Sequence, residues 1–137
     1  MLIPVIQSEL PRMWDLVLPY LKLSFRKSPI PIPEDKVYQA IAADEMRLFM
    51  ITKDGALHGA CILRVEDHFD TKVLNIYALS HDRHFTGQEE CFQQAEELAT
   101  LLGCEYLIGY GRRGFSKQSP QWGFKHVQTV MARKVGG

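Results

Sequence analysis

The sequence predicts one domain of the α/β or α+β class, built on a mixed β-sheet. A chain of 137 residues, of which 46% are hydrophobic, can bury one core without disulfides or metals. Strand-like patterns follow one another between residues 47 and 79, and a clear helical pattern over residues 86–103 then lies between two strand-like stretches. These observations predict a single domain over residues 1–137 in which helices and strands share one core.

The N-terminal part predicts one strand and a helix that a proline interrupts. Leu2–Ile6 is short and apolar, and Ser8 can cap the next helix because its hydroxyl accepts a free N–H of the first turn. Apolar residues then recur at helical spacing, at Leu10, Met13, Trp14, Val17 and Leu21. Because Pro19 lacks the N–H of a helical hydrogen bond, we expect one broken helix or two short ones.

A second helix is predicted from Pro33 onward. Proline suits the first helical position, and the acidic residues Glu34 and Asp35 suit the positive end of the helix dipole. Val37 and Ile41 lie four residues apart and predict its buried face.

Three strands are predicted next. Arg47–Thr52 and Ala60–Glu66 flank the dipeptide Asp54-Gly55, which is typical of a tight hairpin turn. Val73–Leu79 follows a polar turn and extends the meander. We therefore expect these three strands to pair antiparallel.

A long helix and two further strands complete the predicted order. Thr86 and Glu89 have the spacing of a capping box, and one apolar face follows at Phe92, Ala95, Ala99 and Leu102. Gly103 supplies a stop, and Tyr106–Tyr110 is the next strand, which a β-α-β connection places parallel to Val73–Leu79. The loop 111–123 precedes a last predicted strand, Lys125–Val135.

Composition excludes several classes of function. Lys plus Arg and Asp plus Glu both number 16, so the chain lacks the basic excess on which non-specific nucleic-acid binding depends. Three cysteines without C-x-x-C spacing predict neither a disulfide framework nor a zinc site. No apolar run approaches the roughly 18 residues of a membrane span or the pattern of a signal sequence. We expect a reducing, cytoplasmic location.

Three segments, taken in order, resemble the GNAT superfamily of acyl-CoA N-acyltransferases. Residues 76–83, Ile-Tyr-Ala-Leu-Ser-His-Asp-Arg, are similar to the end of its fourth strand and the start of its cofactor loop. Gly111–Phe115 with Trp122–Lys125 is similar to the segment after its fifth strand, and Val130–Lys134 to its final strand. The resemblance implies a mixed, mostly antiparallel sheet of six to seven strands with helices on both faces. It also implies transfer of an acyl group, acetyl in particular, from acetyl-CoA to an amine.

The resemblance also implies a set of cofactor-binding residues. The family's pyrophosphate loop reads R/Q-x-x-G-x-G/A, and its alignment on Arg83 places Thr86 and Gln88 at the small positions, with Gly87 between them. Glycines there let backbone N–H groups approach phosphates at a helix N-terminus. Backbone groups of the strand residues Ala78, Leu79 and Ser80 would bind the pantetheine and polarise the thioester carbonyl. Thr86 and Gln88 depart from the pattern because they carry side chains.

The catalytic residues are less clearly marked. An amine must lose a proton, and the candidate bases are Glu66 and Tyr77 on neighbouring strands, with Asn75 also on the strand where the family places its base. The leaving thiolate must gain a proton, and Tyr110 or Ser116 could supply it, although the family's tyrosine is missing after the fifth strand. Each of these residues could instead be an ordinary sheet or surface residue.

A second interpretation stays open. The departures in the phosphate loop and at the proton donor are also expected of a non-catalytic GNAT-like protein, such as a phage virion component or an interaction module. His81 and His84 lie in the loop but form no metal site by themselves. A basic group that suits a phosphate, an acidic partner or solvent comprises Arg112, Arg113, Lys117 and Lys125.

Overall fold

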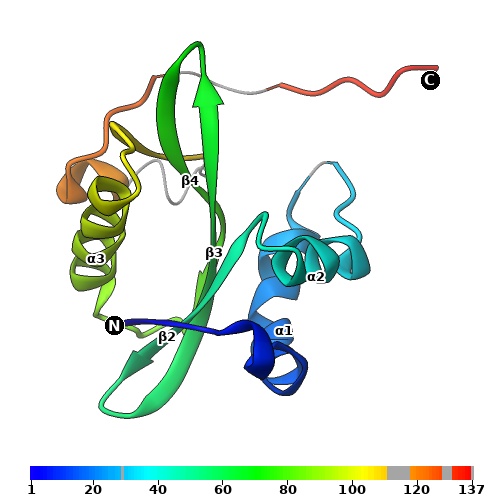
Figure 1. Ribbon diagram of the computed structural model, residues 1–137, viewed down its shortest axis with the longest axis vertical. Coiled ribbons are helices and arrows are strands. Elements are labelled where there is room, and N and C mark those ends of the chain that lie inside the picture. Colours follow the sequence, from blue (N-terminus) through cyan, green and yellow to red (C-terminus); the bar gives the residue numbers. More distant parts are fainter. Residues whose placement is uncertain (29, 111–117, 128–130, 137) are drawn as a thin grey trace.

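The computed structural model describes residues 1–28, 30–110, 118–127 and 131–136. A five-stranded sheet forms the centre of this part of the chain (Figure 1). Its strands are β1 (Leu2–Pro4), β2 (Arg47–Lys53), β3 (Ala56–His68), β4 (Thr71–His81) and β5 (Tyr106–Gly109). The helices are α1 (Leu10–Arg26), α2 (Glu34–Ala42) and α3 (Gln88–Leu101), with single 3-10 turns η1 (Gln7–Glu9) and η2 (Ser119–Trp122).

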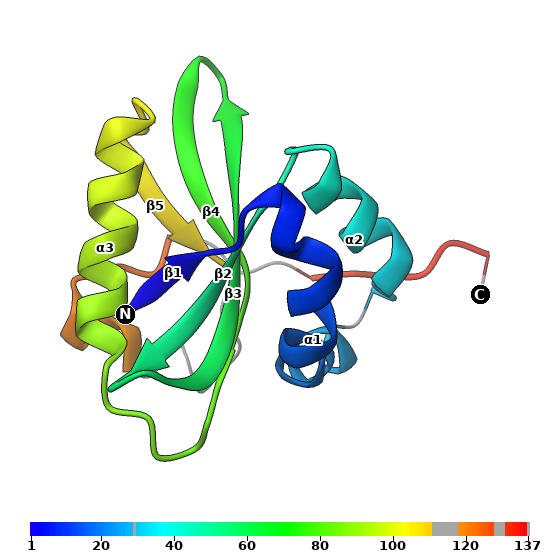
Figure 2. The same cartoon turned by 60° about the horizontal axis from the view of Figure 1, so that its bottom comes forward.

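The sheet is mixed and mostly antiparallel, as the sequence predicts. Its strands lie in the order β1-β2-β3-β4-β5, and only the β4–β5 pair is parallel. Helices α1 and α2 cover one face and α3 covers the other (Figure 2). The predicted class, the hairpins and the parallel pairing across α3 are therefore confirmed.

The sheet has five strands among the described residues, where the sequence predicts six to seven. The last strand, expected over Lys125–Val135, is absent from the described residues 125–127 and 131–136. Val127, Met131 and Val135 are almost fully exposed, so these three side chains do not pack against a core. A segment with an alternating apolar pattern forms a strand only where it can pair with a neighbouring strand and pack its apolar side chains into a core.

Helix α1 continues through Pro19, so the expected break is wrong. Pro19 removes one helical hydrogen bond, but Val17, Leu21 and Phe25 on either side of it are buried on the same face. Burial of this stripe against the sheet stabilises the helix more than the missing bond costs. The expected cap at Ser8 is also wrong, since Ser8 lies within η1 and no side chain caps α1.

Two apolar cores lie on opposite faces of the sheet. The α1/α2-side core joins the two N-terminal helices to Leu48, Ile62 and Ala78, and it contains the predicted Val37 and Ile41. The α3-side core joins Ala95 and Ala99 of α3 to the other face of the same strands.

None of the helices in the described residues has both the length and the apolar character of a membrane span.

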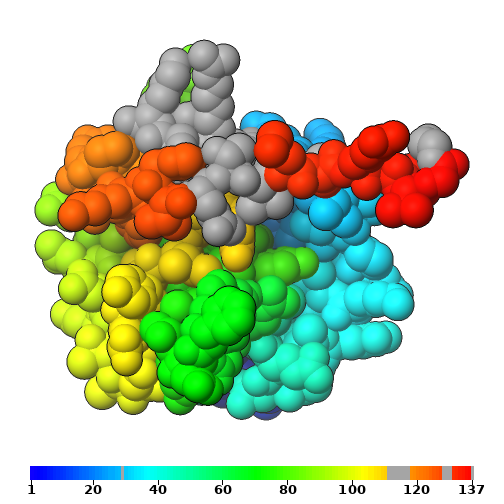
Figure 3. Space-filling model, turned by 90° about the horizontal axis from the view of Figure 1, so that it is seen from above, coloured from blue at the N-terminus to red at the C-terminus, as the bar shows by residue number. Residues whose placement is uncertain are grey.

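Residues 118–124 pack against α3. The segment from Ser119 to Phe124, orange in Figure 3, lies against this helix, and Phe92 contacts the rings of Trp122 and Phe124 at centroid distances of 5.1 and 5.2 Å. Gly123 between them has φ +84°, which suits a glycine. These aromatic residues therefore pack at the turn beside α3.

Replacing Leu21 by Ala should cost about 3 kcal/mol of unfolding free energy, because Leu21 is 0% exposed between α1 and the sheet. Leu16→Ala on the same helix is the matched control, since Leu16 is 54% exposed and should change stability by roughly 0.5 kcal/mol or less. Urea unfolding followed by circular dichroism measures both. Equal losses for the two variants would contradict the packing of α1.

Candidate active site

The two parallel strands β4 and β5 separate partway along the sheet. Strand β5 pairs with Val73–Ile76 and ends at Gly109, whereas β4 continues to His81. Backbone groups on this side of residues 77–81 therefore have no strand partner in the described part of the chain. Such an opening offers hydrogen-bonding backbone to a ligand that lies along β4.

A β-bulge marks the point of separation. Ile62 of β3 pairs with Ala78 and Leu63 pairs with Ile76, so Tyr77 is the extra residue on β4. Tyr77 and Ala78 consequently both face the α1/α2-side core, and Leu79 packs against the α3-side core. The predicted cofactor residues Ala78, Leu79 and Ser80 thus lie together along the unpaired edge.

The loop after β4 begins at a firmly held aspartate. The Asp82 N–H donates to the His58 carbonyl at 2.7 Å. Its carboxylate lies 3.0 Å from Nδ1 of His58 and accepts the Tyr20 hydroxyl of α1 at 3.0 Å. Arg83 follows directly, is exposed, and has no polar partner among the described residues. The Arg83 guanidinium is therefore available to a ligand, while the residue before it, Asp82, is held in place.

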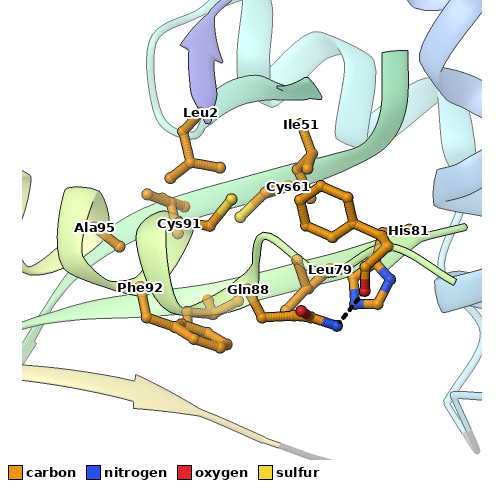
Figure 4. A pocket seen from close by; sticks show the side chains of 12 residues that line it. Leu2, Ile51, Cys61, Leu79, His81, Gln88, Cys91, Phe92 and Ala95 are labelled. Atoms are coloured by element: carbon orange, nitrogen blue, oxygen red, sulfur yellow. Dashed lines mark hydrogen bonds between the residues drawn. The ribbon is translucent and has the colours of Figure 1, made fainter. Parts of the chain in front are cut away.

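Helix α3 begins at Gln88, with Gly87 as its N-cap residue and no side-chain cap. The predicted capping box is wrong, because the Thr86 hydroxyl oxygen accepts a hydrogen bond from Nζ of Lys53 at 2.8 Å. Gln88 donates from Nε2 to the Phe85 carbonyl at 2.7 Å (Figure 4). A Cβ on Gly87 would lie 2.5 Å from Cζ of Phe85, so any larger residue there would have to displace the Phe85 ring.

Lys53 is a cation at this site that no pattern in the sequence marks. It ends β2 and reaches the loop only because the β2–β3 hairpin runs beside it, 33 residues away along the chain. With Arg83 it gives the loop before α3 two positive side chains. Glu89 and Glu90 in the first turn of α3 oppose them, so the cations and the backbone N–H groups together must determine anion binding there.

An apolar pocket lies between the end of β4 and the start of α3 (Figure 4). Its lining includes Leu79, Phe85, Cys91 and Phe92, with Gln88 at the helix start. Burial raises the pKa of the Cys91 thiol, and also that of the Cys61 thiol beside it. Both cysteines stay protonated at neutral pH and serve as apolar core residues.

A polar cluster lies on the α1/α2 face of β3 and β4, next to the bulge. Glu66 accepts hydrogen bonds at Oε2 from Nε and Nη2 of Arg64, at 2.8 and 2.5 Å, and from Nδ2 of Asn75 at 2.8 Å. Its Oε1 lies 3.0 Å from Nε2 of His68. The Arg64 guanidinium also lies 5.1 Å from the centroid of the Tyr77 ring. The structure thus places two candidate bases, Glu66 and Tyr77, in one group.

The pKa of Glu66 is set by opposing effects. Burial raises it, but hydrogen bonds from Asn75, His68 and Arg64, together with the Arg64 charge, lower it more, and the net shift is downward from 4.5. Glu66 is therefore a carboxylate at neutral pH with both oxygens engaged. A carboxylate of lowered pKa is a weak general base, so this arrangement favours an orienting role for Glu66.

Asn75 is the unusual member of this cluster. The residue is 2% exposed, and its Oδ1 has no hydrogen-bond partner among the protein groups that the structure describes. An unpaired buried carbonyl oxygen costs about 1–3 kcal/mol, so such an atom calls for an explanation. The sequence marks Asn75 as a candidate only through its position on the strand. Nothing in the sequence indicates that its Oδ1 lacks a partner.

The other predicted residues are more scattered. Tyr110 follows β5 on the opening side and is exposed. Ser116 lies outside the described residues, as do Arg112, Arg113 and Lys117. Among the positions that are described, no three His, Cys, Asp or Glu side chains form a metal-binding group, and His84 is exposed.

Replacing Glu66 by Gln should lower the unfolding free energy at neutral pH and matter less in acid. The folded-state pKa of Glu66 is depressed, so its ionised form adds stability above the ordinary pKa of 4.5. That contribution disappears as the pH falls through the folded-state pKa. Urea unfolding of both proteins from about pH 7 to about pH 3 measures the difference. Glu97→Gln, at an exposed position of α3, is the control, and a difference that does not change with pH would contradict the assignment.

Comparison with known proteins gives matches in structure only. No family model and no curated protein matches the sequence. Aminoglycoside N-acetyltransferase AAC(6')-Iy, solved with the bisubstrate analogue CoA-S-monomethyl-acetylneamine, is similar with a TM-score of 0.74 at 13% identity. The alignment covers 98% of this chain and 96% of that chain.

Two other acetyltransferases are similar over the same length. Glucosamine-6-phosphate N-acetyltransferase from Arabidopsis thaliana has a TM-score of 0.68 at 14% identity, with 98% of this chain and 97% of that chain covered. The aminoglycoside acetyltransferase meta-AAC0020 from an uncultured soil metagenomic sample, solved with sisomicin, has a TM-score of 0.68 at 12% identity, with 98% and 96% covered. At such identities the likeness is one of fold. This chain has the fold of the GNAT acetyltransferases, as its sequence predicts.

Proposed function

We propose that this protein transfers an acyl group, acetyl in particular, from acyl-CoA to an amine. The observation that carries the proposal is the opening between β4 and β5, which starts at the Tyr77 bulge and leads into the loop of Arg83 and the start of α3. Structural neighbours with the same fold are named as acetyltransferases, and one was solved with a CoA-linked bisubstrate analogue. Fold alone does not fix function, so the site residues must carry the argument.

The residues present fit an acyl-CoA molecule. Arg83 is exposed and has no polar partner within the described residues, and Lys53 lies beside Thr86, so two cations are available to the phosphates. The unpaired edge at Ala78, Leu79 and Ser80 can exchange hydrogen bonds with the amide groups of a pantetheine arm. Thr86, Gly87 and Gln88 would border the pyrophosphate at the start of α3.

The reaction joins the amine nitrogen to the acyl carbon and breaks the bond from that carbon to sulfur. Acyl-CoA supplies an activated thioester. Backbone N–H groups on the open edge of Ala78–Ser80 would stabilise the negative charge that develops on the carbonyl oxygen. The nitrogen gives up one proton, and the departing thiolate takes one. Tyr110, which follows β5 at the end where β4 and β5 separate, would donate the proton that the thiolate takes.

A non-catalytic role is the second candidate. The observation that favours it is the loop itself, because Thr86 bonds to Lys53 and Gln88 bonds to the Phe85 carbonyl within the protein. In such a protein the fold would persist while the loop is closed by its own side chains. The finer expectation of a phage virion component finds no support in the structural neighbours compared above, which are named as acetyltransferases.

Isothermal titration with acetyl-CoA separates the two candidates. We expect micromolar binding, weakened about tenfold or more by Arg83→Ala because a charge-assisted phosphate contact is lost, which is roughly 1.4 kcal/mol. Lys53→Ala should weaken binding by about two- to fivefold, since an exposed cation contributes less. Lys22→Ala, at an exposed position of α1, is the control. An absence of heat at millimolar ligand from folded protein would exclude the acetyltransferase function.

A further inference from the structure

We infer that the buried Oδ1 of Asn75 receives an N–H of the acceptor amine, and that Glu66 is the positioning residue that turns this oxygen toward it. The inference rests on the proposed acyl transfer and assigns an acceptor-binding atom within the same site. Four observations carry it: the orientation of the Asn75 amide, its unpaired oxygen, its position in the sheet, and the charge around it.

The hydrogen bond to Glu66 fixes the orientation of the Asn75 amide. A carboxylate only accepts hydrogen bonds, so the Asn75 atom 2.8 Å from Oε2 of Glu66 must be the NH₂ group. Rotating the amide by half a turn would bring two oxygens together and bury the two N–H donors. Oδ1 is therefore held on the side away from Glu66, where no described protein group bonds to it.

The position of Asn75 suits an acceptor site. Asn75 pairs with Arg64 of β3 on one side and Ile108 of β5 on the other. The next pair, Ile76 with Gly109, is the last before β4 and β5 separate, and the bulge at Tyr77 follows. The Asn75 side chain stands on the α1/α2 face of the sheet, so a donor bound to Oδ1 would lie on that face, over the start of the open edge where the thioester carbonyl is proposed to bind.

The chemistry of the cluster selects a hydrogen-bond donor rather than a charge. Arg64 balances the charge of Glu66, and both Glu66 oxygens already accept hydrogen bonds. The Asn75 Oδ1 is the acceptor of the cluster that has no hydrogen bond. A neutral amide oxygen accepts a hydrogen bond from an N–H group but does not take the proton. Asn75 would therefore orient the nitrogen lone pair toward the acyl carbon. The amine proton passes to solvent as the C–N bond forms and the C–S bond breaks, and the thiolate is protonated as CoA leaves.

The first test is nuclear magnetic resonance of the wild-type protein saturated with CoA. Methylammonium is the smallest amine probe, and tetramethylammonium has the same charge without an N–H. We expect the Asn75 side-chain NH₂ resonances to shift in a saturable way with methylammonium and not with tetramethylammonium. Equal shifts with both probes, or none with methylammonium, would overturn the inference. If CoA itself does not bind, the proposed function fails instead.

The second test uses Asn75→Leu, which has a similar volume and no polar atoms, with acetyl-CoA and methylamine as substrates. The KM for methylamine should rise about tenfold or more, while the Kd for CoA stays within about twofold. Thr100→Val, which removes a hydroxyl on the far part of α3, is the control. A merely structural Asn75 would leave the KM unchanged in folded Asn75→Leu, and that result would also overturn the inference.

Discussion

The bulge at Tyr77 is the constraint on which the rest of the site depends. Side chains alternate along a strand, so one extra residue exchanges the faces of everything that follows. Without the bulge, Leu79 would face α1 and α2 while Ala78 faced α3. With it, Ala78 enters the α1/α2-side core and Leu79 enters the α3-side core. The same extra residue lies where pairing with β5 has just ended, so the local change in strand direction coincides with the opening.

The helices on the two faces hold this opening in place by different means. Helix α3 packs through small residues, Cys91, Ala95 and Ala99, which lets it lie close to the sheet. Helix α1 packs through larger ones and tolerates Pro19, since its buried stripe continues on both sides of the proline. Tyr20, the next residue, donates to the Asp82 carboxylate, so α1 also fixes the residue before Arg83. Core packing and loop position are thereby linked through one helix.

Much of the fold could be predicted from local patterns, but much less of the site. Val37 and Ile41 lie in the core, as their helical spacing predicts, because that spacing places residues on one buried face of a helix. The contact of Lys53 with Thr86 could not be predicted, since it joins segments that meet only when the hairpin folds beside the loop. The failure of the expected capping box has the same cause, because Thr86 has a partner outside the helix. The expected last strand does not form in the described residues. An alternating apolar pattern alone does not show whether the folded chain has a core for those side chains to pack against.

Charge is distributed unevenly along the proposed site, and this distribution bears on its chemistry. At the α3 end, Lys53 and Arg83 are cations that an anionic ligand can use, although Glu89 and Glu90 oppose them. At the bulge end, Arg64 and Glu66 cancel each other, and His68 engages the remaining carboxylate oxygen. Recognition there must therefore depend on hydrogen bonds, and the buried Asn75 oxygen is the polar atom that needs a partner. A phosphate-bearing molecule would be attracted at one end, while its reaction partner would be selected at the other by the direction of a single carbonyl group.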